Sequence, residues 1–265
     1  MCSKYFFLCD FIVPSFLLDM IAALGETTGG PALPRLREQM LDSVEGRRIL
    51  RERPRVNSET VDMEILSRLP QGTFGRAYMT WLDRCGVTPD TREPVSFLSI
   101  FPHTYSILTL LEVHYIDDPE LAYVMQRYRE CHDFYHCITD MPVSVEYELA
   151  LKFFEFAHFG LPMAGISAVF GHLRLDWNTR NALFRDYVPW ALRCGASAKP
   201  LITVYWEERW EQNVEEVKRE FGIWNPPPPD WSKIVALSEA KKAKKHKAAV
   251  PAGQQQPPIE LPTSS

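Results

Sequence analysis

The chain has 265 residues, of which 46% are apolar, and a formal net charge of -5. This length and apolar content are enough for one hydrophobic core, so we expect a single domain with tails rather than a wholly disordered chain. The negative net charge, with lysines concentrated near the end of the chain, argues against a nucleic-acid partner.

Residues 1–19 form an atypical N-terminal segment. Residues 5–24 are rich in Phe, Leu and Ile, but Asp10 and Asp19 lie among them and Pro14 interrupts them. Buried charges are costly in a bilayer, so we do not predict a transmembrane helix here. The six cysteines show no Cys-x-x-Cys spacing and no dense disulfide framework, which indicates free thiols in a reducing compartment.

Helical periodicity recurs from residue 36 to residue 221, whereas no convincing alternation of apolar and polar residues appears. The sequence therefore predicts an all-α fold with a single helical domain over residues 20–224. One of its helices is predicted over residues 73–84. Gly86 should end this helix, because glycine tolerates the left-handed backbone that follows a last helical turn.

A further helix is predicted to begin after Asp118. An aspartate can cap a helix, Pro119 suits the first helical position, and Glu120 places negative charge in the first turn. Residues three or four positions apart form an apolar stripe along this helix, namely Leu121, Met125, Tyr128, His132 and His136. The two imidazoles are therefore expected to be partly buried.

Two histidines and two carboxylates are expected to gather near the end of this helix. His132 and His136 are four residues apart, so their imidazoles lie one above the other on one face, and Asp133 flanks them. Pro142 breaks the helix, and a return helix that starts near Ser144 can bring Glu148 back against the pair. Two histidines and a glutamate can hold Zn2+ with one position open for water or substrate.

The role of Asp133 and the use of the other polar residues stay open at this point. Asp133 points about 100° away from His132 around the helix, so it can ligate a metal, orient a ligand or transfer a proton. Histidines four apart on an apolar face are more often structural than metal-binding when no other signal is present. Glu148 and Lys152 are also spaced as an ordinary i, i+4 ion pair.

Three later segments carry weaker signals. Residues 153–170 are dense in Phe, Met, Ala and Gly, with Pro162 as a kink or stop, which suits either a lipid tunnel or an ordinary core. A helix with an aromatic stripe is predicted over residues 206–221. Residues 225–265 are rich in Pro and Gln, with a basic run at 241–247, which predicts a disordered tail that is either solvated or in contact with anionic lipid.

The motif His-Asp-x-x-His-x(11)-Glu resembles the signature of the coenzyme Q (ubiquinone) biosynthesis protein family, which acts on the polyprenylated benzoate head group. The resemblance spans residues 20–222. Other segments that carry it are, in order, Ala23–Gly29, Arg48–Arg55, Asp90–Arg92, Tyr115–Glu130, Gly160–Met163, Pro189–Ala191 and Tyr205–Glu208. An ordered set of unrelated segments is much more specific than the metal pattern alone.

The resemblance implies a carboxy-lyase that removes the C1 carboxylate of 4-hydroxy-3-methoxy-5-polyprenylbenzoate and yields 2-methoxy-6-polyprenylphenol. The implied ligands of a Zn2+ ion are His132, Asp133, His136 and Glu148. Asp133 is the first candidate for the catalytic proton donor if it does not bind the metal, and Lys152 and Glu155 are second choices. A hydroxylating variant, in which oxygen replaces the carboxylate, would need a redox metal and stays open.

The resemblance also implies a location and partners. The implied location is the matrix side of the mitochondrial inner membrane, where the protein would be peripheral. The implied partners are the polyprenylated benzoate lipid and other coenzyme Q biosynthesis proteins in a multi-subunit complex, and homo-oligomerisation stays open. The N-terminus has no arginine before Arg35 and so lacks a recognisable presequence. Residues 95–114 exceed the family pattern, and we interpret them as an insertion from a translated intron, with a membrane-touching loop as the alternative.

Other functions compete with this one. The main alternative is a non-catalytic scaffold that binds the lipid and organises the other coenzyme Q enzymes. A carboxylate-bridged di-iron protein would use the pairs Asp133-x-x-His136 and Glu155-x-x-His158, but clear partner glutamates are missing. A His-Asp phosphohydrolase would require further ligands on separate helices.

Overall fold

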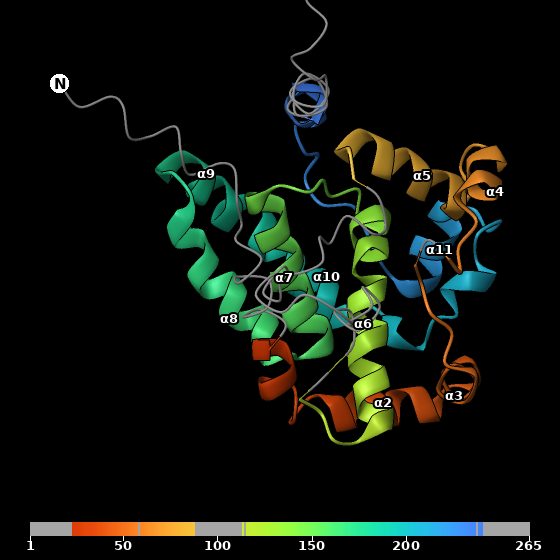
Figure 1. The fold of residues 1–265 in the computed structure, drawn as a ribbon. Helices are drawn as coiled ribbons and strands as arrows, with labels where there is room; N and C mark the ends of the chain where they lie inside the picture. The colour runs from red at the N-terminus through yellow and green to blue at the C-terminus, as the bar shows by residue number, and fades with distance from the viewer. Residues whose placement is uncertain (1–22, 58, 88–112, 114, 237, 241–265) are drawn as a thin grey trace, which may run out of the picture.

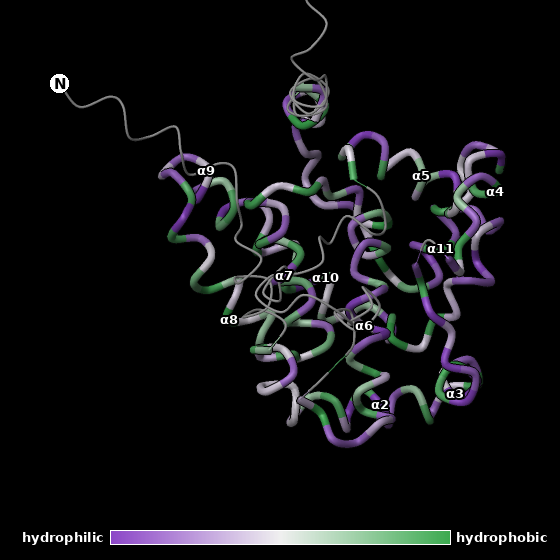
Figure 2. The backbone as a smooth tube through the Cα atoms, viewed as in Figure 1, coloured by the Kyte–Doolittle hydropathy of each residue, from purple (hydrophilic) through white to green (hydrophobic). Residues whose placement is uncertain are grey.

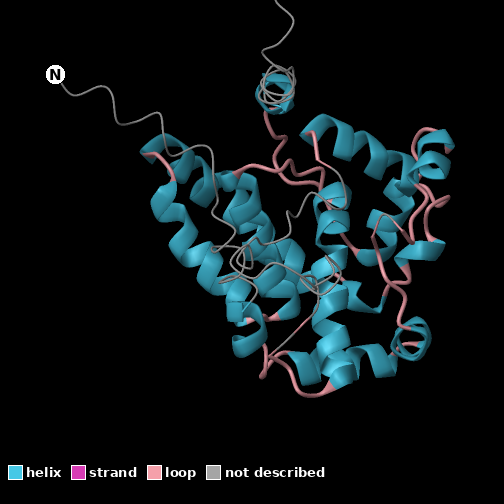
Figure 3. Ribbon diagram, viewed as in Figure 1, coloured by secondary structure: helices cyan, strands magenta, loops and turns pink. Residues whose placement is uncertain are grey.

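The computed structural model describes residues 23–57, 59–87, 113, 115–236 and 238–240. Within these residues all regular secondary structure is helical, which confirms the predicted all-α fold (Figure 3). The predicted N-terminal segment 1–19, the basic run 241–247 and almost all of the predicted insertion 95–114 lie outside the described residues.

The longer helices follow one another as α2 (Leu33–Asp42), α3 (Val44–Glu52), α4 (Met63–Arg68), α5 (Phe74–Cys85), α6 (Pro119–Ile138), α7 (Val145–Phe159), α8 (Pro162–Gly171), α9 (Trp177–Ala182), α10 (Val188–Ser197) and α11 (Val214–Phe221). Short turns of 3-10 or π type connect them, namely η3 (His172–Arg174), η4 (Leu183–Tyr187), η5 (Leu201–Thr203) and η6 (Trp206–Glu208). The chain is also helical at residues 23–28 and 231–236.

Helix α6 runs through the middle of the molecule (Figure 1). It begins as predicted, because the Asp118 side chain accepts hydrogen bonds from the backbone N–H groups of Glu120 and Leu121, at 2.8 and 3.1 Å. Residues on more than one side of α6 are buried, not only the predicted apolar stripe. His132 and His136 are only 8% and 0% exposed. The two imidazoles therefore lie deeper than the apolar stripe alone indicated.

The turn after α6 brings the chain back along the predicted path. Asp140 adopts a left-handed backbone with φ of 51°, and α7 begins at Val145, close to the expected start. Helix α7 packs between α8 and α10 (Figure 1). It ends at Gly160, whose φ of 64° favours glycine, and Pro162 opens α8. Pro162 thus acts as a stop rather than as a kink.

The prediction of one continuous helix over residues 206–221 is wrong. The structure has the short turn η6, a break, and then α11, whose N-terminus is capped by the Asn213 side chain. The break arises because the backbone carbonyl of Trp210 accepts a hydrogen bond from the N–H of Gly75, at 2.9 Å, at the start of α5. A carbonyl used in this way is not available to a continuous helix.

The expectation of a disordered tail from residue 225 is wrong for its first part. Residues 225–236 lie against the domain, where the Trp231 indole N–H donates to Asp140 Oδ2 at 3.1 Å. The Arg84 guanidinium lies over the Trp231 ring, 3.4 Å from its centroid. An anchoring aromatic side chain with a cation–π contact outweighs the Pro-rich composition of this stretch.

His158 joins α7 to two other elements and does not take part in a metal cluster. Its Nδ1–H donates to the Gly195 carbonyl at 2.9 Å, and its Nε2 accepts from the backbone N–H of Leu201 at 3.0 Å. This pattern requires a neutral ring, and burial lowers the pKa of His158 to about 4. The di-iron alternative would need this histidine as a ligand, whereas both its nitrogens serve the backbone.

Because His158 is buried as a neutral ring, we expect the protein to become less stable in mild acid. Because the folded-state pKa of His158 is depressed, its stabilising contribution is complete above pH about 6.5 and is lost as the pH falls toward 4. The loss approaches about 3 kcal/mol in the free energy of unfolding. Urea unfolding of wild type and His158→Phe at several values between pH 7 and pH 4.5 tests it. The variant should lose less stability over this range, and parallel pH curves would contradict the prediction.

Candidate metal centre

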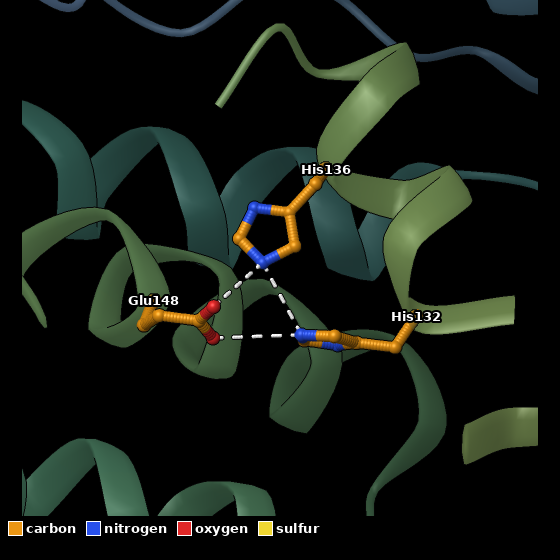
Figure 4. Close-up of side chains that lie close together, drawn as sticks. All are labelled: His132, His136 and Glu148. Atoms are coloured by element: carbon orange, nitrogen blue, oxygen red, sulfur yellow. Dashed lines mark hydrogen bonds and ion pairs between the residues drawn. The ribbon is translucent and has the colours of Figure 1, made fainter. Parts of the chain in front are cut away.

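Three side chains from α6 and α7 converge on one point (Figure 4). The Nε2 atoms of His132 and His136 lie 3.2 Å apart. Glu148 approaches both, with Oε1 3.1 Å from His136 Nε2 and Oε2 3.4 Å from His132 Nε2. In the described part of the chain, these three residues are the group whose potential ligand atoms all lie within 4.8 Å of one another.

The second nitrogen of each imidazole is already engaged, which decides where the lone pairs point. His136 Nδ1–H donates to the backbone carbonyl of Met141 at 3.2 Å, and His132 Nδ1 lies 2.6 Å from Glu155 Oε1. In the neutral rings the Nε2 lone pairs then face each other and the Glu148 carboxylate. Three acceptors that face one another are complementary to a cation, and this donor set fits Zn2+.

Electrostatics at the cluster agree with an ionised carboxylate beside polarised imidazoles. Burial raises the pKa of the Glu148 carboxyl, but His136 and His132 outweigh this effect and hold the pKa well below its usual range. For His132, burial and Lys152 lower the pKa, while Glu155 and Glu148 raise it more, so the net pKa is raised. Glu148 therefore remains an anion available to a metal.

Behind His132 lies a second carboxylate, Glu155, whose side chain is fully buried. Its Oε2 accepts hydrogen bonds from Lys152 Nζ at 2.5 Å and from the Tyr128 hydroxyl at 2.8 Å. Burial by itself raises the pKa of Glu155, yet the Lys152 and His132 charges lower it to about 2. This anion orients the His132 ring and balances the Lys152 ammonium.

The structure brings together most of the residues predicted from the sequence. Lys152 and Glu155 contact His132, and Lys152 Nζ lies 3.4 Å from its Nδ1. Asp133 is not a member of the three-residue cluster. Asp133 is partly buried. The pKa of the Cys85 thiol is raised to about 11, mainly by burial and to a smaller extent by the charge of Asp133. The predicted roles of Asp133 as a ligand or proton donor stay predictions.

Sequence reasoning missed the groups that support His136. The Met141 carbonyl accepts hydrogen bonds both from His136 and from the indole N–H of Trp81, the latter at 2.7 Å. The Trp81 ring also stacks against the imidazole, with centroids 5.4 Å apart. Trp81 comes from α5, far away in the chain, and no spacing in the sequence points to it. Among the described residues, the cysteines Cys85, Cys131, Cys137 and Cys194 are free thiols.

No helix in the described residues has the length and apolar content needed to cross a bilayer. The sequence matches the model of the family described as Coenzyme Q (ubiquinone) biosynthesis protein Coq4, over residues 13–114 and 103–227. A crystal structure of a protein from Nostoc punctiforme PCC 73102 assigned to ubiquinone biosynthesis has the same fold, with a TM-score of 0.53 and 19% identity. That alignment covers 78% of this chain and 95% of the other.

Two fungal relatives are much more similar in sequence. The protein of Laccaria bicolor named "Ubiquinone biosynthesis protein COQ4, mitochondrial" is 63% identical over 232 residues, which cover 87% of this chain and 71% of the relative. The protein of the same name from Coprinopsis cinerea is 64% identical over 225 residues, or 85% of this chain and 70% of the relative. With both halves of the chain matched and the metal motif assembled in space, the chain belongs to the Coq4 family of coenzyme Q (ubiquinone) biosynthesis proteins.

Proposed function

We propose that the chain acts in ubiquinone biosynthesis as a metal-dependent carboxy-lyase that converts 4-hydroxy-3-methoxy-5-polyprenylbenzoate to 2-methoxy-6-polyprenylphenol. The observation that carries the proposal is the convergence of His132, His136 and Glu148, with both imidazoles locked by second hydrogen bonds, in a chain of the Coq4 family. These three residues would hold Zn2+, and Asp133 is the candidate for a further ligand.

Decarboxylation of the benzoate requires a cation near the substrate and a proton delivered to ring carbon C1. A divalent metal, when bound, supplies positive charge that orients the benzoate and stabilises the charge that develops on its oxygens. Protonation of ring carbon C1 is followed by cleavage of the bond between C1 and the carboxylate. The electron pair of that bond returns to the ring, and carbon dioxide leaves.

Lys152 is our candidate for the group that delivers this proton. Its side chain is 17% exposed, so it reaches the solvent-accessible side of the cluster, and its Nζ lies near both Glu155 and the Tyr128 hydroxyl. The buried Glu155 carboxylate holds Lys152 in position through the hydrogen bond from Lys152 Nζ to Glu155 Oε2. After the transfer, Lys152 regains a proton from solvent. Asp133 is the second candidate for the same step.

The proposal extends to location and partners. The names of the relatives place them in mitochondria, and we propose the same compartment for this chain, peripheral on the matrix side of the inner membrane. A membrane position suits the polyprenyl tail of the proposed substrate, which prefers hydrocarbon to water. The partners would be other coenzyme Q biosynthesis proteins in a multi-subunit complex.

Incubation of the purified, metal-loaded protein with a short-chain prenylated 4-hydroxy-3-methoxybenzoate tests the activity. We expect release of carbon dioxide, and a decrease in rate of about 100-fold or more in Lys152→Met, since a positioned acid contributes roughly 10²–10⁴-fold. Lys199→Met, at an exposed lysine, is the matched control and should keep the full rate. If Asp133→Asn loses the rate and Lys152→Met does not, Asp133 is the donor.

The same experiment separates the enzyme from a lipid-binding scaffold. One outcome is that the wild-type protein holds metal and binds the lipid but forms neither decarboxylated nor hydroxylated product, with or without oxygen. That result would refute the enzyme and support the non-catalytic scaffold. A product with a hydroxyl group at C1, formed only in air, would indicate the hydroxylating variant and a redox metal.

A further inference from the structure

The outward side of α8 is apolar, where a surface helix usually carries polar residues. The α8 face, as we define it, consists of Ile166, Val169 and Phe170 on α8 and Leu173 in the following turn η3, which are 37%, 52%, 63% and 63% exposed. From residue 156 to residue 173 the sequence contains no Asp, Glu, Lys or Arg. In Figure 1 α8 lies at the outer edge of the molecule, and in Figure 2 its tube is mainly green or white.

The inward side of α8 is closely packed on α7, so the exposed residues are not needed for that contact. A Cβ added at Gly165 would come within 2.7 Å of the Phe156 ring, and one added at Gly171 would meet the Leu149 side chain. Glycine at these two positions lets the helices approach closely. The α8 face then points away from α7, and a cluster of exposed apolar side chains of this kind marks a surface that is covered in the working protein.

The rim of the α8 face is aromatic and cationic. Trp177, at the start of α9, is 69% exposed, and Arg174, directly after Leu173, is exposed with no ion-pair partner in the described part of the chain. The nearby acid Asp176 turns to the backbone and caps α9. Exposed indole and guanidinium groups beside uncharged apolar surface are typical of proteins that rest on a bilayer, because they reach the headgroup layer.

We propose that the α8 face docks on a lipid bilayer, with Ile166, Val169, Phe170 and Leu173 among the acyl chains and Arg174 at anionic headgroups. A bilayer fits better than a second protein copy. Protein interfaces carry about one hydrogen bond per 100–200 Å², whereas these four side chains have no hydrogen-bonding groups and hydrocarbon requires none. The positive rim is complementary to anionic lipid, although the whole chain has a net charge of -5.

The role that we assign to membrane docking rests on the proposed function, because it assumes a substrate with a polyprenyl tail. The helix on which α8 packs, α7, carries Glu148 and Lys152, and Leu149 lies against Gly171 at the end of α8. A bilayer on the α8 face would thus lie one helix away from the proposed metal centre. A substrate with a polyprenyl tail could then present its ring to the protein while its tail stays among the acyl chains.

Flotation of the full-length protein with vesicles tests the docking surface without substrate. Vesicles of phosphatidylcholine alone are compared with vesicles that also contain phosphatidylglycerol. We expect Phe170→Glu with Leu173→Glu to weaken partition to both vesicles by roughly tenfold or more. Arg174→Glu should weaken it only for anionic vesicles. Ile65→Glu, at a 57% exposed apolar residue on α4, is the control and should bind as wild type does.

Other outcomes would overturn the proposal. Equal partition of wild type and the double variant would exclude this face as the docking surface. A wild-type dimer that the double variant dissociates, with unchanged vesicle binding, would assign the face to a second copy of the chain. A marked fall in melting temperature in the double variant but not in Ile65→Glu would mean that the chain itself covers the face. Vesicle binding by the wild type, together with no product in the separate incubation with substrate, would refute the proposed activity and leave the docking surface intact.

Discussion

Replacement of His136 by alanine is expected to remove the bound metal from the purified protein. Wild type should contain about one divalent ion for each chain, whereas His136→Ala and Glu148→Ala should hold almost none, with affinity lowered more than about 100-fold. The reason is geometric, because His136 Nε2 lies 3.1–3.2 Å from both other ligand atoms and is locked there by the Met141 carbonyl. Elemental analysis after exchange into metal-free buffer measures the ion directly.

A graded series gives this experiment its internal control. Glu155→Gln keeps all three ligands but removes the charge behind His132, so its metal affinity should fall by about 10–100-fold, less than in a ligand variant. His172→Ala removes a histidine outside the cluster and should keep wild-type metal content. Equal metal in wild type, His136→Ala and His172→Ala would refute the metal centre.

The largest loss of stability is expected from Glu207→Ala. Arg127 is buried in the core, with its side chain 1% exposed, and Glu207 accepts two hydrogen bonds from its guanidinium, at 2.5 and 2.9 Å. Without the carboxylate, the guanidinium keeps its hydrogen bond to the uncharged Val204 carbonyl at 3.1 Å but loses its charged partner. A buried charge that loses its partner costs about 3–5 kcal/mol in the free energy of unfolding. Urea denaturation at pH 7 measures it.

The neighbouring residue supplies the matched control. Glu208 pairs with Arg48 at 2.5 Å on the surface, with side chains 48% and 40% exposed, so Glu208→Ala should cost far less stability than Glu207→Ala. The double change Arg127→Met with Glu207→Leu removes both charges and should recover most of the stability lost in Glu207→Ala. Similar losses in Glu207→Ala and Glu208→Ala would show that burial of Arg127 does not govern the cost.

Local signals in the sequence are enough to define the helices that carry the metal ligands. Asp118 and Pro119 start α6 through contacts with their immediate neighbours, and a spacing of four places His132 and His136 on one face of any helix. The chain reversal that returns Glu148 follows from signals within a few residues. These predictions succeeded because capping, proline and helical spacing act over one or two turns.

The surroundings of the ligands, and the ends of some helices, depend instead on contacts between distant parts of the chain. Trp81 supports the Met141 carbonyl from another helix, and Glu155 and Lys152 reach His132 from α7. The helix expected over residues 206–221 is interrupted where α5 takes the Trp210 carbonyl, and Trp231 holds a segment whose composition predicted disorder. Such partners lie far apart in the chain, and hydrogen bonds between them leave no periodic pattern in either segment, so packing alone brings them together.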